Sequence, residues 1–169
     1  MKKAVFPLLL TFFAAVGYAQ ESQTAYNFLR LPVSAHAAAL GGDNITIIED
    51  DPSLMFSNPA LLSSVSDKSI NLNFMTYMAG ATTASASYNR IIKQKATVAV
   101  TAQYMDYGKM KEMDANNVQT GEFSAKDIAV SGIFSYMLSD KITGGITAKV
   151  INSYIGDYSS WAVGVDLGL

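Results

Sequence analysis

Few residues of this chain have side chains that could act in catalysis or bind a metal ion, and they are poorly grouped for catalysis. His36 is its single histidine, and three carboxylates follow one another at Glu49, Asp50 and Asp51. Hard cations take carboxylate oxygens as ligands, so this acidic run is a candidate cation site. The interpretation we favour is that Asp51 caps a short helix beginning at Pro52. A histidine without an acid or a cysteine arranged around it is a poor catalyst or ligand, and we interpret His36 as a packing residue.

Nucleophilic, thiolate and nucleic-acid chemistry find no better support. Ser34 and Ser57 lack the glycine-flanked elbow and the base that a serine nucleophile needs. The absence of cysteine excludes disulfides, a lipidated cysteine and thiolate metal sites. A net charge of -2 gives no electrostatic case for nucleic acid. We therefore predict a non-enzymatic protein with no catalytic residues, no metal and no cofactor.

The alternation of side chains along residues 161–169 is the clearest structural signal, because successive strand residues point to opposite faces. One face is wholly apolar, and the other is small or charged. The apolar face carries Trp161, Val163, Val165, Leu167 and Leu169, and the other carries Ala162, Gly164, Asp166 and Gly168. A soluble strand would present long polar side chains on its second face. The pattern is typical of a wall with lipid on one side and a lumen on the other.

Similar alternation occurs in five stretches upstream, which gives about six strands, each long enough for the ~9–11 residues of a tilted membrane strand. The stretches begin near residues 69, 81, 96, 127 and 142. Short polar turns at 93–95 and 139–141 alternate with a polar loop at 108–121, as in membrane barrels. Aromatic residues toward the strand ends are expected at the membrane interfaces: Tyr88, Tyr104, Tyr107, Tyr136, Tyr158 and Trp161.

We therefore predict an all-β fold, in which residues 67–169 form the first strands of a transmembrane antiparallel β-barrel. A sheet in hydrocarbon must close, and known single-chain bacterial barrels begin at about eight strands, so we expect this chain to be the N-terminal part of a longer barrel. A short protein that closes by oligomerising is the less favoured alternative. A soluble β-sandwich binding module is a third. Asp127, Lys149 and Asp166 are expected to face the lumen, where they anchor a plug or tune permeation.

The N-terminus has the form of a secretory signal peptide. Met1-Lys2-Lys3 precedes an apolar run from Ala4 to Val16, and small residues stand at the two cleavage-site positions before Gln20. We predict that residues 1–19 are removed. A signal peptide together with barrel-like strands points to the envelope of a Gram-negative bacterium.

Residues 20–66 are too broken for a barrel wall and are predicted to form a plug with short helices. Residues 34–40 are rich in alanine, and Gly41-Gly42 supplies the left-handed backbone that ends such a helix. A short strand is expected at 45–48. Asp51-Pro52 and Asn58-Pro59 each combine a capping residue with proline at the first helical position, so two further helical turns should begin there.

Two stretches of this segment resemble the PorV/PorQ family of Bacteroidetes outer-membrane proteins, and within it the PorQ branch. They are Asn-Phe-Leu-Arg-Leu-Pro-Val-Ser-Ala-His-Ala-Ala-Ala-Leu-Gly-Gly at 27–42 and Ser-Asn-Pro-Ala-Leu-Leu at 57–62. The family is related to the FadL-type fatty-acid transporters, which carry a comparable Asn-Pro-Ala motif in an N-terminal plug. Complete members are about twice as long and form barrels of roughly fourteen strands, within the known size range.

The resemblance implies a role in type IX protein secretion, in which such barrels hold PorZ-like or PorU-like proteins of the surface attachment complex. The implied environment is the lipid of the outer membrane. The implied structural plug motif consists of Leu31, Pro32, Ser34, Gly41, Gly42, Asn58, Pro59 and Ala60. The alternative function is that of a FadL-like transporter of hydrophobic small molecules, in which Asn-Pro-Ala would gate a ligand.

Overall fold

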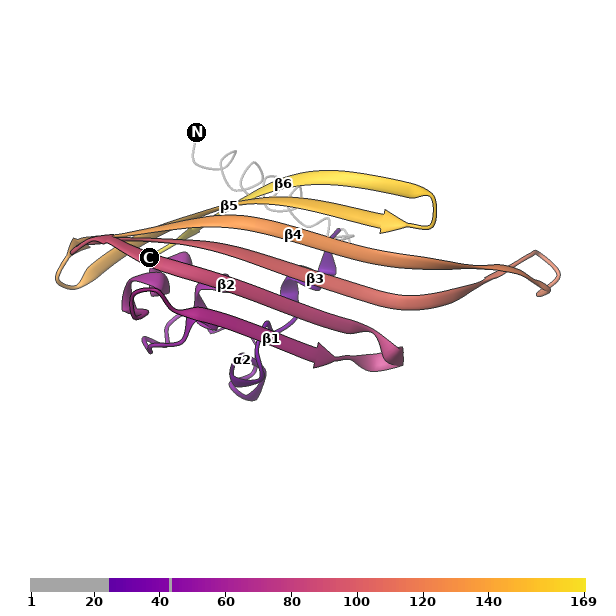
Figure 1. The fold of residues 1–169 in the computed structure, drawn as a ribbon, viewed down its shortest axis with the longest axis horizontal. Coiled ribbons are helices and arrows are strands. Elements are labelled where there is room, and N and C mark those ends of the chain that lie inside the picture. Colours follow the sequence, from indigo (N-terminus) through magenta and orange to yellow (C-terminus); the bar gives the residue numbers. More distant parts are fainter. Residues whose placement is uncertain (1–24, 43) are drawn as a thin grey trace, which may run out of the picture.

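The computed structural model describes residues 25–42 and 44–169, and its strands form a single six-stranded antiparallel sheet (Figure 1). The strand order is β1-β2-β3-β4-β5-β6, so every strand pairs with its neighbours in sequence. The predicted all-β class with antiparallel strands is confirmed. The predicted signal peptide, residues 1–19, lies outside the described residues.

The strands have 7 to 21 residues and the helices 3 to 6. The strands are β1 (Ile70–Thr76), β2 (Thr82–Lys93), β3 (Ala96–Met113), β4 (Gln119–Ser139), β5 (Ile142–Ile155) and β6 (Tyr158–Gly168). The helices are η1 (Asn27–Arg30), α2 (Ala35–Ala39), η2 (Pro52–Phe56), η3 (Pro59–Ser64) and η4 (Met78–Gly80), of which those marked η are 3₁₀ helices. In the described part of the chain, no helix has both the length and the apolar character needed to cross a membrane.

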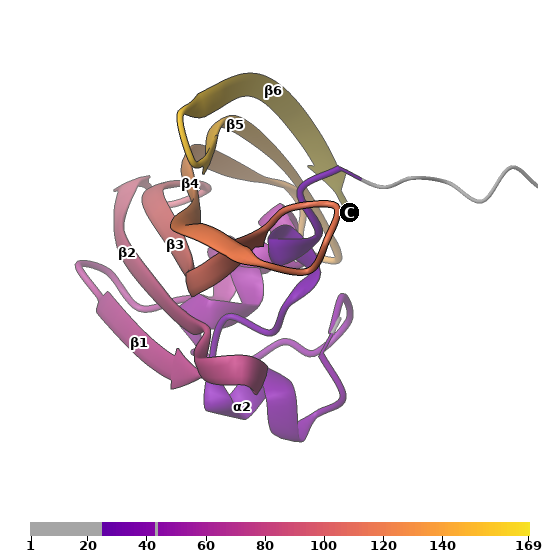
Figure 2. The ribbon, with the colours of Figure 1, turned by 90° about the vertical axis from the view of Figure 1, so that its right-hand side faces the viewer.

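The sheet curls, and the N-terminal segment (residues 25–42 and 44–66) lies on its concave side (Figure 2). Two apolar clusters join segment and sheet. In the first, Phe28 of η1 packs with Met105 and Ile151. In the second, Met55 and Leu62 pack with inward-facing strand residues. The side chains of Met55 and Leu62 are fully buried, so the core of the molecule is the contact between the short helices and the concave face.

The convex face is apolar and uncovered. Leu72 is 76% exposed and Val163 83% exposed, which is the reverse of what alternation achieves in a water-soluble sheet. Large apolar side chains exposed on this face include Ile70, Phe74, Tyr88, Val100, Val130, Phe134, Ile146, Val150, Trp161, Val165 and Leu167. Residues 25–42 and 44–169 contribute no second sheet that would cover them. The described residues therefore form one layer of sheet and not two.

The polar loop predicted at 108–121 is largely strand. β3 and β4 continue as a two-stranded ribbon beyond the rest of the sheet (Figure 1), with Lys111 paired to Glu122 and Glu112 to Gly121. Polar composition pointed to a loop, but a two-stranded ribbon in water can carry polar side chains on both faces. The ion pair between Lys109 Nζ and Glu122 Oε2 at 3.6 Å links its strands.

The strand expected at 45–48 does not form. A strand needs a partner for its main-chain groups, and residues 45–48 pair with no strand of the sheet. Ile45 uses its carbonyl oxygen to accept a hydrogen bond from the Asn58 side chain instead, at 2.8 Å. Ile45 and Ile48 are both exposed.

Candidate functional site

The contact between Asn58-Pro59-Ala60 and the concave face is the most closely fitted part of the interface. The predicted caps are confirmed: Asn58 Oδ1 accepts the Ala60 N–H at 3.0 Å, and Asp51 Oδ1 accepts the Ser53 N–H at 2.7 Å. In both cases proline occupies the start of the helix. These caps satisfy N–H groups that the first helical turn leaves without a partner.

Two glycines of the sheet leave the space in which Asn58-Pro59-Ala60 packs. Gly145 of β5 and Gly168 of β6 are directly paired and face the N-terminal segment. A Cβ at Gly145 would overlap the main chain of Pro59 and Ala60, lying 2.6 Å from the Pro59 carbonyl oxygen. A Cβ at Gly168 would lie 2.9 Å from Pro59 Cδ. The absence of both side chains lets the backbone of η3 rest on the backbone of the sheet.

Hydrogen bonds complete this contact. Ser135 of β4, opposite Gly145 in the sheet, is fully buried, and its hydroxyl donates to the Ala60 carbonyl oxygen at 3.3 Å. The Asn58 amide donates to main-chain oxygens of Ile45 at 2.8 Å and Leu169 at 3.2 Å. Asn58 therefore holds three separate stretches of chain together.

Asn58→Ala should destabilise the protein by about 2 kcal/mol, because it removes a helix cap worth ~1 kcal/mol and leaves carbonyl partners unpaired. Asn58→Ser should destabilise less, since the neutral serine hydroxyl keeps the cap and only the two donated bonds are lost. Thermal unfolding of the three proteins measures the order. Equal loss in both variants would assign the whole effect to the donated bonds rather than to the cap.

The remaining residues of the predicted plug motif lie near the other end of the N-terminal segment. Ser34 caps α2: its Oγ accepts the Ala37 N–H at 3.0 Å and donates to Ser53 Oγ at 2.8 Å, which ties α2 to η2. Leu31 packs against the first apolar cluster. Gly41 and Gly42, at φ of 95° and 101°, have the left-handed backbone predicted for the end of this helix. Pro32 lies close to Gly42.

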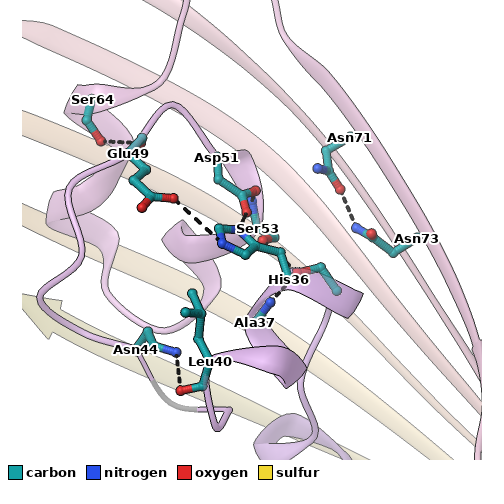
Figure 3. A network of polar contacts seen from close by, with 11 residues as sticks. His36, Ala37, Leu40, Asn44, Glu49, Asp51, Ser53, Ser64, Asn71 and Asn73 are labelled. Atoms are coloured by element: carbon teal, nitrogen blue, oxygen red, sulfur yellow. Dashed lines mark hydrogen bonds and ion pairs between the residues drawn. The ribbon is translucent and has the colours of Figure 1, made fainter.

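His36 is an ionic residue rather than a packing residue. It is exposed, its Nδ1 lies 2.6 Å from Asp51 Oδ2, and its Nε2 lies 3.7 Å from Glu49 Oε2 (Figure 3). The hydrogen bond to Asp51 raises the pKa of His36 above its usual 6.5. Burial raises the pKa of Asp51, but the hydrogen bonds from His36 and Ser53 outweigh it and the net pKa is lowered. The contact joins α2 to the start of η2.

The His36–Asp51 contact makes the N-terminal segment sensitive to pH. Because the pKa of His36 is raised in the folded protein, its contribution is fully present below about pH 6.5 and is lost as the pH rises through the raised value. Because the pKa of Asp51 is lowered, its contribution is present above 3.8 and is lost as the pH falls through the lowered value. Protease cleavage within the segment should therefore be slower at pH 5.5 than at pH 9.

His36→Gln is the control for this prediction. It should remove the difference between pH 5.5 and pH 9 while leaving acid destabilisation in place, since the pKa of Asp50 is also lowered, chiefly by hydrogen bonds from Ser66. An unchanged pH dependence in His36→Gln would contradict the assignment.

The carboxylates of the acidic run at 49–51 cap η2 and contact neighbouring loop residues. Residues 25–42 and 44–169 contain no group of three or more histidine, cysteine, aspartate or glutamate side chains that could hold a metal ion.

The three charged residues predicted to face the lumen lie on the concave face. Lys149 Nζ is 2.5 Å from Asp166 Oδ2, and the Lys149 side chain crosses directly over Gly164 to reach it. Asp127 Oδ2 accepts a hydrogen bond from the Tyr107 hydroxyl at 2.7 Å. The ionic and hydrogen-bond partners of these side chains are thus strand residues rather than residues of the N-terminal segment.

Sequence reasoning missed Gly145, Gly168 and Ser135, and it misplaced Tyr107. Glycine on the inward face of a strand is a signal for close backbone approach, and it was available at both positions. Tyr107 was expected at the membrane interface, but it turns inward to Asp127. Three positions separate it from Tyr104, so the two tyrosines cannot share a face of a regular strand.

The described residues define the class of protein: an all-β chain with one curled antiparallel sheet, an apolar convex face and a helical segment fitted to its concave face. No model of a known protein family matches the sequence, and no match is found among curated proteins.

Proposed function

We propose that the sheet is part of the wall of an outer-membrane β-barrel and that the N-terminal segment is its plug. The observation that supports this most directly is the apolar convex face opposite a fitted, partly polar concave face. In lipid the convex side chains would contact acyl chains, whereas in water they would form an exposed patch far larger than monomers usually carry.

The dimensions of the apolar face agree with a bilayer. On β4 the outward residues are free of charge from Ile128 to Leu138, a span of eleven residues, and a tilted membrane strand needs ~9–11. Charged residues of the same face lie toward the strand ends, where Lys126 Nζ is 3.8 Å from Asp106 Oδ2. The proposal assigns the free edges of β1 and β6 to pairing with further wall strands, because unpaired edges are not tolerated in hydrocarbon.

The proposed role is that of a non-enzymatic component of the type IX secretion system, in the outer membrane of a Gram-negative bacterium of the Bacteroidetes. It rests on the resemblance of residues 27–42 and 57–62 to the PorV/PorQ family. In this role the barrel is a membrane anchor that holds PorZ-like or PorU-like proteins of the surface attachment complex. The plug, fixed by the glycine contact at Gly145 and Gly168, would keep the barrel closed.

Affinity capture tests this role. The full-length tagged protein, extracted from native outer membranes in mild detergent, should retain surface-complex proteins identified by mass spectrometry. A tagged outer-membrane barrel of unrelated sequence, extracted in parallel, is the control. Recovery of no component above that control would reject the secretion role and leave the membrane assignment standing. Extraction without detergent would reject both.

A FadL-like transporter of hydrophobic small molecules is the second candidate, and one pocket favours it. A pocket of about 500 Å³ lies between η1, η4 and β3, and Phe28, Leu31 and Met105 are among its apolar lining residues. Lipid extracted from the purified protein and identified by mass spectrometry tests this function. Fatty acid retained by the wild type and lost in Met105→Arg would support transport, and its absence from the wild type would reject it.

A further inference from the structure

One buried acid on the concave face has no cationic partner among residues 25–42 and 44–169. Asp127 is 6% exposed, and its polar contact is the hydrogen bond from the Tyr107 hydroxyl. The ion pairs of the described chain use other carboxylates, those of Glu49, Asp51, Asp106, Glu122 and Asp166. A neutral hydroxyl donates a hydrogen bond but does not compensate a negative charge, and an uncompensated buried charge is costly.

Asp127 lines a pocket of about 480 Å³ that holds no other charged side chain. Tyr26, Tyr107, Met110 and Ile155 contribute aromatic and apolar lining. Hydroxyl groups come from Ser153, directly opposite Asp127 in the β4–β5 pairing, and from Ser160, whose Oγ lies 3.2 Å from Tyr26 Oη. The pocket lies toward the end of the sheet where β5 turns into β6.

We propose that this pocket binds the ammonium or guanidinium head of an organic cation. A single buried carboxylate supplies the opposite charge, tyrosine rings attract cations through their faces, and the serine hydroxyls accept the remaining N–H groups. An inorganic hard cation would need several carboxylate or carbonyl ligands, whereas Asp127 is the lone acid of this lining. An anion is excluded by the charge of Asp127.

Such a head belongs either to a free amine or to a lysine or arginine side chain of a polypeptide. Calorimetric titration of the full-length protein in detergent distinguishes the two sources. The probes are cadaverine, with uncharged 1,5-pentanediol as its control, and acetyl-Ala-Lys-Ala-amide and acetyl-Ala-Arg-Ala-amide. Cadaverine or one of the peptides should bind, and pentanediol should not. The tighter probe identifies the source, and binding should weaken as ionic strength rises.

Asp127→Asn keeps the shape of the side chain and an acceptor for Tyr107, and it should weaken binding roughly ten- to a hundred-fold. Asp157→Asn is the matched control, because it removes the same charge from an exposed residue of the neighbouring β5–β6 turn. It should leave the dissociation constant within about two-fold, since screened surface charges contribute little.

Ser153→Leu is the second variant, should Asp127→Asn fail to fold. It fills the pocket beside Asp127 without changing any charge, and it should also abolish binding. Failure of all three cationic probes to bind the wild type would overturn the proposal. So would equal weakening in Asp127→Asn and Asp157→Asn, which would indicate diffuse attraction rather than a pocket. The inference depends on the concave face alone, so its failure and the failure of the secretion role are separate results.

Discussion

Gly145→Ala is expected to destabilise the folded protein by about 3 kcal/mol, at the upper end of the usual cost of overpacking. The added methyl group would overlap main-chain atoms of Pro59 and Ala60. Main-chain atoms, unlike a flexible side chain, cannot relieve such an overlap by changing rotamer. The N-terminal segment must therefore lift from β5. Thermal unfolding measures the loss, and faster proteolysis within residues 25–66 shows where it occurs.

Gly144→Ala is the matched control, one residue away on the other face of the same strand. Its Cβ would lie 3.5 Å from Leu138 Cδ1, an ordinary van der Waals contact, so the change should stay within about 0.5 kcal/mol. Both variants reduce the flexibility of the unfolded chain equally, so their difference isolates the contact with Pro59 and Ala60. Similar stability in the two would mean that the N-terminal segment does not rest on β5.

Gly168→Ala tests whether the two glycines act as one surface. Its Cβ would overlap the Asn58 side chain and approach Pro59, so alone it should also displace η3. Once the segment has lifted, the second substitution has nothing left to disturb. The double variant should therefore lose clearly less than the sum of the single losses, because both act on one contact.

The strands and the helix caps of this fold could be predicted from the sequence because both depend on local patterns of residues. Trp161, Val163 and Val165 alternate with small residues, and this period fixes which face each side chain takes whatever the strand pairs with. Asn58 followed by Pro59 is equally local, since the capping oxygen bonds an N–H group two residues away. Both predictions needed no knowledge of the rest of the chain.

The contacts between distant segments were beyond such patterns. The contact of Gly145 and Gly168 with Pro59 depends on the register of β5 with β6 and on the position of η3. Neither can be predicted from a few neighbouring residues of the sequence. The pairing of His36 with Asp51 likewise depends on the loop between them. Polarity also misled at 108–121, because strand ribbons that project into water need no apolar face.

If the proposed membrane assignment holds, Val100→Arg is expected to destabilise the protein by about 2–4 kcal/mol in a bilayer, the cost of an arginine on the lipid face near the membrane midplane. Val100 is 61% exposed at the middle of the apolar stripe of β3, with Tyr88 and Gly132 beside it in the sheet. The arginine would have to desolvate or pull water into the hydrocarbon. Urea unfolding of the protein in liposomes, with the yield in the outer-membrane fraction, measures the effect.

Met113→Arg makes the same kind of change on the same strand, at the tip of the β3–β4 ribbon, where Met113 is 52% exposed. Because it lies beyond the apolar stripe, the proposed bilayer predicts a cost of only ~0–1 kcal/mol there. A water-soluble protein predicts something different: two exposed apolar residues replaced by arginine should each change stability by no more than about 0.5 kcal/mol. A large loss at Val100 beside a small one at Met113 is thus a depth dependence that water does not produce. Two equally small effects would indicate that the convex face contacts solvent or a protein partner and not lipid.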